Sequence, residues 1–456
     1  MPGAKARTSD APKGPARPGQ EPPDVPVRPP GPQSRALAAR LAAVECPAVD
    51  ARREARARES ETEQVPIVYA GGRGANVVDA DGNRYVDLAA GFGALLLGHV
   101  PERVSLAIEP QLARLWLALG DVYPSEAKIL LCERLAKLYP RPGARVLLGS
   151  SGADAVTAAI KTAALATGRL GIVAFDGAYH GLSYAPLAAC GLRGSFRLPF
   201  AAQLNQNVIF VPYPAHDAAL GATLEQVAAS LDHGNVGAVL VEPILGRGGC
   251  IRPPSGLLHS LRVACDRAGA LLVCDEIWTG LGRSGAWLAS VEAGVAADIV
   301  CLGKGLGGGL PISACIGSGE AMAAWGAHGG STIHTGTHFG GPVGCASALA
   351  MLDALEAEEL PQRAKVVGER WMAQLRRQTE GLGVVEVRGS GLMVGVALEG
   401  GAARAHSVTR RLLERGWIVL TGGAAGDALT LTPPLDIDEA LLAAFVRALA
   451  EALRTA

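Results

Sequence analysis

The amino-acid sequence predicts an α/β protein, with a large domain built on a mostly parallel sheet covered by helices on both faces, plus a smaller α+β domain. Between about Leu112 and Gly340, short apolar runs alternate with longer helical stretches. Unbroken apolar strands that alternate with helices are typical of parallel sheets buried on both faces. After residue 345 a long helix is followed by short strand-like runs and a final amphipathic helix, which is the pattern of a separate α+β unit.

Composition indicates a large core and excludes several function classes. The 456 residues include 42 Lys plus Arg and 43 Asp plus Glu, with 49% hydrophobic residues. A nucleic-acid scaffold or a polybasic membrane binder needs a surplus of Lys and Arg, so neither is expected. No apolar run approaches the length of a membrane span and no secretory signal is visible, so we expect a cytoplasmic protein.

Cysteine and histidine spacing predicts no metal site. The nine cysteines include no Cys-x-x-Cys pair and are expected to be reduced, mostly buried thiols. His334 and His338 have helical spacing but lie in a Gly-rich segment that will not hold a helix.

The chain divides into four parts by composition. Ten prolines within residues 1–33 predict a disordered tail, because such a composition cannot bury a core. Residues 34–111, with a helical pattern from Ser34 and a turn at 81–83, are expected to contribute to the small domain. Residues 112–344 form the predicted large domain, and residues 345–456 form the C-terminal small domain.

Six apolar runs of the large domain are predicted to be strands. Helices are predicted between several of them, including residues 153–167 and 256–268. Ligands of such sheets bind beyond the carboxyl ends of the strands, so the residues that follow each run are the candidates for a site. The strand candidates are Arg145–Leu148, Gly171–Phe175, Val208–Pro212, Gly237–Val241, Ala270–Cys274 and Ile299–Leu302.

The first candidate is the helix start that follows Leu148. Free backbone amides of Ser151, Gly152 and Ala153 at a helix N-terminus predict a phosphate site. An ordinary N-cap is the alternative, because Ser is common immediately before a helix.

Two further segments carry polar side chains to the same edge. Tyr179 and His180 follow one strand, and Asp275 and Glu276 follow another. A carboxylate at this edge can hold a proton on a ring nitrogen, although each segment taken alone also fits a solvated turn. The glycines of GLGRSG match G-x-G-x-x-G, but no helix or ribose-binding acid supports a dinucleotide site, and we reject it.

Lys304 is the most informative single residue. It lies immediately beyond an apolar strand and among glycines, where a lysine is rare because burial of its ammonium group is costly. A desolvated lysine has a lowered pKa, which suits a Schiff-base nucleophile, and glycines let the backbone approach a flat cofactor. The alternative is a lysine that extends to solvent.

Together these segments meet the needs of one cofactor. A phosphate cup, an aromatic ring, a carboxylate for a ring nitrogen and a Schiff-base lysine are what pyridoxal 5'-phosphate (PLP) requires. At this point the sequence resembles the class III (ω-amino acid or ornithine-type) aminotransferases of PLP fold type I, from about Ala70 to the C-terminus. The resemblance is carried in order by VVDADGNRYVDLAAGFGALLLGH, SSGADAVTAAIK, FDGAYHG, VEPILGRGG, CDEIWTGLGRSG, LGKGLGGGLPIS, TGTHFGGPVGCASA, VRGSGLMVG and LTPPL.

The resemblance implies a role for each matching residue. Lys304 would form the Schiff base and move a proton, Asp275 would pair with the pyridine nitrogen, and Glu242 would line the active site. Tyr179 and Ile277 would cover the two ring faces. Thr337 would reach the phosphate from a neighbouring subunit, which implies a homodimer. The implied cofactor-binding residues are Ser151, Gly152, Ala153, Tyr179, His180, Asp275, Ile277, Lys304 and Thr337.

Departures from the family pattern concern the substrate. Trp278 replaces a frequent Gln and implies a reshaped pocket. Thr430 stands where users of 2-oxoglutarate have a carboxylate-binding Arg, and Leu245 and Arg247 replace their Gln and Glu. Two interpretations of Arg247 stay open: it binds a substrate carboxylate as a bidentate partner, or it is a surface residue. Arg283 and Arg388 match family positions and fit either a structural or a substrate-binding role.

The expected function is therefore PLP-dependent transamination, from a primary amine or ω-amino acid to a 2-oxo acid. An aminomutase or a decarboxylating relative would use the same Lys304 and Asp275 without an external oxo acid. A non-catalytic binding module is the alternative from another class. The sequence names neither the donor nor the acceptor.

Overall fold

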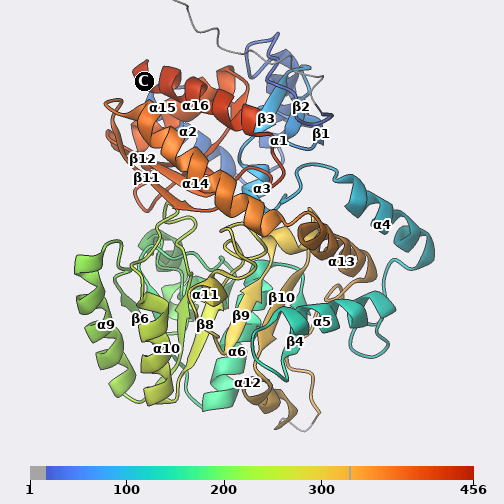
Figure 1. The fold of residues 1–456 in the computed structure, drawn as a ribbon, viewed down its shortest axis with the longest axis vertical. Coiled ribbons are helices and arrows are strands. Elements are labelled where there is room, and N and C mark those ends of the chain that lie inside the picture. Colours follow the sequence, from blue (N-terminus) through green and yellow to red (C-terminus); the bar gives the residue numbers. More distant parts are fainter. Residues whose placement is uncertain (1–16, 328–329, 456) are drawn as a thin grey trace, which may run out of the picture.

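The computed structural model describes residues 17–327 and 330–455 and is built around a seven-stranded sheet (Figure 1). Strand β10 runs antiparallel to both of its neighbours, and all the other neighbouring pairs are parallel. The predicted mostly parallel sheet is therefore confirmed. In sheet order the strands are β4 (Arg145–Gly149), β10 (Ser313–Gly317), β9 (Ile299–Leu302), β8 (Leu271–Asp275), β7 (Val236–Val241), β5 (Gly171–Phe175) and β6 (Val208–Val211).

Helices cover both faces of this sheet, as its sequence pattern predicts. Ile172 and Ala174 of β5 pack in one cluster with helix α6 (Gly152–Thr167), whereas Val173 and Phe175 pack in the other core cluster, which includes helix α10 (Leu257–Ala268). Successive strand residues point to opposite faces, so a strand that is apolar at every position needs a cover on each side. The remaining helices of this part include α5 (Glu126–Leu138), α7 (Tyr184–Ala188), α8 (Gly194–Arg197), α9 (Asp217–Asp232), α11 (Ala289–Glu292) and α12 (Gly319–Ala323).

Strand β10 is absent from the six predicted strands. Its sequence, SACIG, is short and contains mostly small residues, and it follows Lys304 by a brief connection that holds no long helix. An antiparallel neighbour needs no crossover helix, so the alternation of strands and helices that identified the other six gives no signal here.

Two four-stranded sheets form the smaller α+β part (Figure 1). One has the order β11 (Val384–Ser390), β12 (Met393–Leu398), β15 (Ala428–Leu431) and β14 (Leu420–Gly422). The other joins both ends of the chain, in the order β1 (Tyr69–Arg73), β2 (Asn76–Asp79), β3 (Arg84–Asp87) and β13 (Trp417–Ile418). Trp417 pairs with Val86 in parallel, so the segment before the large sheet and the C-terminal third share a sheet.

Helices complete this part of the molecule. Helix α2 packs on α15, and α14 packs on α16, while α13 packs on α4 and α5 beside the large sheet. The helices are α1 (Pro32–Ala42), α2 (Ala48–Ser60), α3 (Ala90–Gly93), α4 (Glu102–Arg114), α13 (Pro342–Ala357), α14 (Leu360–Thr379), α15 (Gly401–Glu414) and α16 (Glu439–Arg454).

The disordered tail predicted for residues 1–33 is corrected where the structure describes it. Residues 1–16 lie outside the described residues. From Arg17 onward the chain lies against the sheet of β1–β3: Asp24 exchanges two backbone hydrogen bonds with Arg84, and Asn83 accepts a bond from the amide of Val27. Composition shows that this segment cannot form a core of its own. It does not show that hydrogen bonds to distant residues hold the segment in place.

The described residues contain no helix that is both long and apolar enough to span a bilayer. Within the same residues no three His, Cys, Asp or Glu side chains gather in a way that would hold a metal ion. All nine cysteines are free thiols, and most of them are buried.

Candidate active site

The candidate residues converge at the carboxyl edge of the seven-stranded sheet. Glu242 follows β7, Asp275 ends β8, and Lys304 lies two residues after β9. These three strands are neighbours in the sheet, so the residues that follow them come together although the sequence separates them by up to 62 positions. Tyr179 and His180, which follow β5, join them from the far side of β7.

Asp275 and His180 form a buried pair at the centre of this edge. Asp275 is 3% exposed, and its Oδ2 lies 2.7 Å from His180 Nδ1. Burial alone would lower the pKa of His180, but the hydrogen bond and the charges of Asp275 and Glu242 outweigh burial and raise it. His180 Nε2 is buried without a hydrogen-bond partner, and the amide of Ile277 donates to Asp275 Oδ1.

Glu242 holds two loops in place. Its Oε1 accepts a hydrogen bond from the Tyr179 amide at 2.7 Å, and its Oε2 accepts one from the Gly246 amide at 3.0 Å. Burial raises the pKa of Glu242 to about 7, and the nearby Asp275 adds to the rise while His180 and the two amides oppose it. The loop that carries Tyr179 and the loop that carries Arg247 are thus tied to one carboxyl group.

Lys304 is half-buried beneath an aromatic ring. Its Nζ lies 4.6 Å from the centre of the Trp278 ring, and its backbone adopts φ of +31°. Burial lowers the pKa of Lys304 and the charge of Arg247 lowers it further, although Asp275 and Glu242 oppose this. A backbone conformation that L residues rarely adopt is a strain that functional sites often contain.

The Trp278 ring lies so close to two glycines that no side chain would fit at either position. The ring is 7% exposed, and a Cβ at Gly93 would lie 2.3 Å from its Nε1, while one at Gly246 would lie 2.3 Å from its Cε3. The ring therefore occupies space that side chains at these positions would fill. The reshaped pocket expected from Trp278 is consistent with its position against Lys304.

The phosphate cup predicted before α6 is corrected in one detail. Ser151 and Asp154 form a capping box at the start of the helix. Asp154 Oδ2 accepts a hydrogen bond from the Ser151 amide at 2.9 Å. The Ser151 amide is therefore engaged by the protein itself, and the amides of Gly152 and Ala153 are the first-turn donors that have no intrahelical acceptor. The N-cap alternative is therefore observed, and it leaves the Gly152 and Ala153 amides as donors for an anion.

Gly152, Gly303 and Ile277 meet at one point of the crevice. A Cβ at Gly152 would lie 2.8 Å from Ile277 Cδ1, and one at Gly303 would lie 3.3 Å from Ile277 Cγ2. Two backbone segments without side chains thus border an aliphatic side chain, which leaves a flat, narrow surface. The donor amides, the carboxylate of Asp275 and this surface fit the phosphate, the ring nitrogen and the ring face of PLP.

Arg247 lies at the crevice, with its guanidinium carbon 4.4 Å from the centre of the Tyr179 ring. Of the other two arginines considered, Arg283 is fully buried and donates to the carbonyls of Leu392 and Pro433. Arg388 donates to the Gly249 carbonyl at 2.7 Å and pairs with Glu386. The contacts of Arg283 and Arg388 are those of structural residues.

Thr337 and Thr430 are placed differently from the other candidates. Thr337 is exposed on the segment before α13, and among the described residues no hydrogen bond joins it to Ser151 or Lys304. Thr430 is buried in β15, and its hydroxyl oxygen has no partner. Within one chain Thr337 therefore makes no hydrogen bond to these candidate residues.

Tyr213 contacts the segment that carries Glu242 and is absent from the candidates found in the sequence. Its hydroxyl donates to the Glu242 carbonyl at 3.2 Å, and burial raises its pKa well above the ordinary value. It follows β6, the edge strand, by two residues, so the rule that strand ends carry site residues applied here as well.

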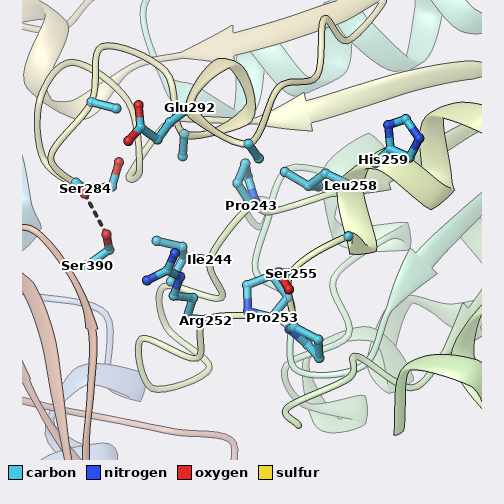
Figure 2. A pocket seen from close by; sticks show the side chains of 15 residues that line it. Pro243, Ile244, Arg252, Pro253, Ser255, Leu258, His259, Ser284, Glu292 and Ser390 are labelled. Atoms are coloured by element: carbon cyan, nitrogen blue, oxygen red, sulfur yellow. Dashed lines mark hydrogen bonds between the residues drawn. The ribbon is translucent and has the colours of Figure 1, made fainter. Parts of the chain in front are cut away.

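A separate cavity of about 420 Å³ is lined in part by Pro243 and Ile244, which follow Glu242 in the chain (Figure 2). None of the candidate residues above lines it. Figure 2 shows the Ser390 hydroxyl, which donates to the Ser284 carbonyl, at one side of the cavity. The labelled lining residues are Pro243, Ile244, Arg252, Pro253, Ser255, Leu258, His259, Ser284, Glu292 and Ser390.

Comparison with known proteins identifies the family. The family described as aminotransferase class-III matches residues 57–453. The chain is 40% identical over 388 residues to the acetylornithine aminotransferase of Mycobacterium tuberculosis, which covers 84% of this chain and 91% of that protein. It is 34% identical over 398 residues to the 5-aminovalerate aminotransferase of Pseudomonas putida, with 83% and 91% covered.

Solved structures agree with this assignment. A PLP-bound amine transaminase from an uncultivated Pseudomonas species superposes with a TM-score of 0.81 at 30% identity, covering 86% of this chain and 95% of that one. An (S)-enantioselective omega-transaminase from Thermomicrobium roseum gives a TM-score of 0.83 at 27% identity, with 92% and 98% covered. The predictions of PLP fold type I, of PLP as cofactor and of transamination are confirmed, and the chain belongs to the class III aminotransferase family.

Proposed function

We propose that this aminotransferase takes its amino group from a primary amine or an ω-amino acid, passes it to a 2-oxo acid, and uses Lys304 as its central residue. The observation that carries the proposal is the convergence of Lys304, Asp275 and Glu242 at three adjacent strand ends. The relatives act, by their names, on acetylornithine and 5-aminovalerate, which supports a donor with a terminal amine.

Each residue of the crevice has a task that follows from its chemistry. When bound, PLP supplies an electron sink that makes the substrate Cα–H bond acidic. The Lys304 amine, with its lowered pKa, would hold the cofactor and then move the proton at the substrate Cα. Asp275, itself oriented by His180, would keep the pyridine nitrogen protonated.

The walls of the crevice would orient the ring and exclude water. Tyr179 would cover one ring face and Ile277 the other, while the amides of Gly152 and Ala153 would bind the phosphate. Glu242 would hold the loops that carry Tyr179 and Arg247 at the distance that substrate entry requires.

We propose further that the active unit is a cytoplasmic homodimer in which Thr337 completes the neighbouring site. Large apolar side chains are exposed in the segment from Phe92 to Tyr123, including Trp116 at 73% exposed. So many exposed large apolar side chains within one segment are typical of a subunit interface. Thr337, exposed in one chain, would then find its partner groups across that interface.

The test is the absorption spectrum of the purified protein during single half-reactions. Amines are added one at a time without any oxo acid. We expect a cofactor band that bleaches with particular primary amines or ω-amino acids and returns on addition of a 2-oxo acid. A band that no amine changes would contradict the proposed donor class, and sedimentation of the same sample tests the dimer.

A further inference from the structure

Four arginines from three distant parts of the chain lie between the Tyr179 ring and the protein surface. Arg52 and Arg56 lie one turn apart on α2, Arg193 precedes α8, and Arg247 follows β7. Burial lowers the pKa of both Arg52 and Arg56, and the charges of Arg193 and Arg247 lower both pKa values further. We call these four residues the arginine cluster.

The loop at residues 423–426 is hydrogen-bonded to two of the four arginines. The Gly423 amide donates to the Arg247 carbonyl at 2.9 Å, and Arg193 Nε donates to the Ala424 carbonyl at 3.2 Å. A Cβ at Gly426 would lie 3.2 Å from the Cβ of Ala402, at the start of α15. Because α2 packs on α15, one loop holds two arginines near the helix that supplies the other two.

Among the described residues the cluster has no ion-pair partner, unlike its neighbours on the same helix. Arg53 pairs with Asp50 at 2.7 Å, and Arg58 lies 3.7 Å from Glu54. Among the described residues, no carboxylate lies within ion-pair distance of any of the four arginines. Glu59, the acid that acts on Arg56, is itself 3.7 Å from His406.

This arrangement places like charges near one another without an ion-pair partner among the described residues. Burial and the repulsion from the other three arginines lower the pKa of Arg56 to about 10. Repulsion among four guanidinium groups raises the free energy of the folded chain when no carboxylate pairs with them. A positive region of this kind raises the local concentration of anions.

The cluster reaches the reaction centre through Arg247. Arg247 stacks on the Tyr179 ring, and its charge acts on Lys304. Arg247 and Arg56 are partly buried, whereas Arg52 and Arg193 are exposed, so the cluster extends from the crevice to the surface. A donor whose amine lies at Lys304 would therefore extend its remote end toward these four arginines.

We propose that the arginine cluster binds a dianionic group, a phosphate ester or a pair of carboxylates, at the end of the amine donor remote from its amine. The inference rests on the proposed function and refines its donor class. One carboxylate is satisfied by one bidentate guanidinium group, so four unpaired arginines exceed the need of a simple ω-amino acid. Electrostatic capture at the surface, followed by stacking at Arg247, then orders the donor along the crevice.

The test compares donors that differ only in their remote end. Primary amines of equal chain length, ending in a methyl group, one carboxylate, two carboxylates or a phosphate, react with the PLP-loaded enzyme in single half-reactions. We expect kcat/KM for at least one dianionic amine to exceed that for the monocarboxylate by about 10-fold or more, the scale of one charge-assisted hydrogen bond. The two dianionic arms tell a phosphate from a dicarboxylate.

Matched variants on α2 isolate the cluster. In an Arg52→Gln/Arg56→Gln protein, the ratio of kcat/KM for the dianionic amine to that for the methyl-ended amine falls by about 10-fold or more. The control, Arg53→Gln/Arg58→Gln, removes the same charge from the same helix and keeps that ratio. If amines react but the two double variants have the same ratio, the cluster proposal is overturned and the proposed function stands.

A binding measurement covers the case in which no amine reacts and the proposed function fails. Inorganic phosphate and a simple dicarboxylate are titrated into the holoenzyme while its thermal midpoint is recorded. Stabilisation of the wild-type protein and of the Arg53→Gln/Arg58→Gln control, but not of Arg52→Gln/Arg56→Gln, supports the cluster independently of activity. Equal stabilisation of all three proteins, or none, overturns it.

Discussion

The charges of two neighbouring regions are paired differently. We call the residues at the sheet edge, Asp275, Glu242 and Lys304, the floor of the crevice, and we call the arginine cluster its mouth. At the floor, Asp275 pairs with His180 at 2.7 Å and Glu242 accepts two backbone amides, so both carboxyl groups are buried with partners. At the mouth, Arg52, Arg56 and the rest of the arginine cluster have no acidic partner among the described residues. Charges that position a reaction are satisfied within the chain, whereas charges that await a ligand are left open.

The two regions also differ in origin. The floor comes from residues that follow adjacent strands of one sheet, and each strand end is marked in the sequence. The mouth comes from a helix near the N-terminus, a loop before α8 and a loop of the smaller part. Mutations that remove a charge should therefore have opposite consequences at the two places.

The largest effect is expected at Lys304. Replacing Lys304 with Ala removes the amine that the floor desolvates, so we expect the transamination rate to fall by roughly 10³-fold or more. Half-reaction rates measured by cofactor absorbance check this. Retention of the wild-type rate would contradict the assignment of Lys304, and an external amine that restores part of the rate would strengthen it.

Loss of Asp275 tests the pairing at the floor. Asp275→Ala leaves His180 buried without its acceptor, so we expect the free energy of unfolding to fall by about 3 kcal/mol. Urea unfolding of the cofactor-free chain measures it. The double variant with His180→Ala completes a cycle, and additive effects of the two changes would argue against the pair.

Glu242 makes stability depend on pH. Its pKa is about 7 in the folded chain and 4.5 ordinarily, so the folded state binds the proton more readily. The resulting stabilisation is fully present below pH 4.5 and is lost as the pH rises through 7, by up to about 3 kcal/mol. Glu242→Gln should flatten this decline in urea unfolding of the cofactor-free chain, and an unchanged slope would contradict it.

The smallest effect is expected at the mouth, and its sign is reversed. Arg56→Gln relieves repulsion from three arginines, so the free energy of unfolding should rise by up to about 1 kcal/mol after allowance for solvent screening. Arg53→Gln, which breaks the pair with Asp50, should lower it slightly or leave it unchanged. A loss of stability in Arg56→Gln at low salt would contradict the view of the mouth as an open anion site.

Elements with a clear apolar periodicity were predicted from the sequence, and elements without one were not. Six of the seven strands of the large sheet were predicted, because apolar runs flanked by helices identify them. Strand β10 was not, since an antiparallel neighbour after a short connection leaves no such pattern. Residues 17–33 were predicted as part of a disordered tail, because their partners lie far along the chain: Asn83 is 56 positions from Val27, and Arg84 is 60 positions from Asp24.

The sequence by itself determined the fold class and the cofactor, and it marked the residues that meet at one edge of the sheet. Each depends on residues close to one another in the chain: a strand end followed by Lys304, by Asp275 or by a helix start. Only the tertiary structure decided that the Ser151 amide is engaged by Asp154, that Trp278 lies over Lys304, and that four neighbouring arginines have no ion-pair partner among the described residues. Local patterns encode strands and turns, whereas the charge that surrounds a side chain depends on segments that only folding brings together.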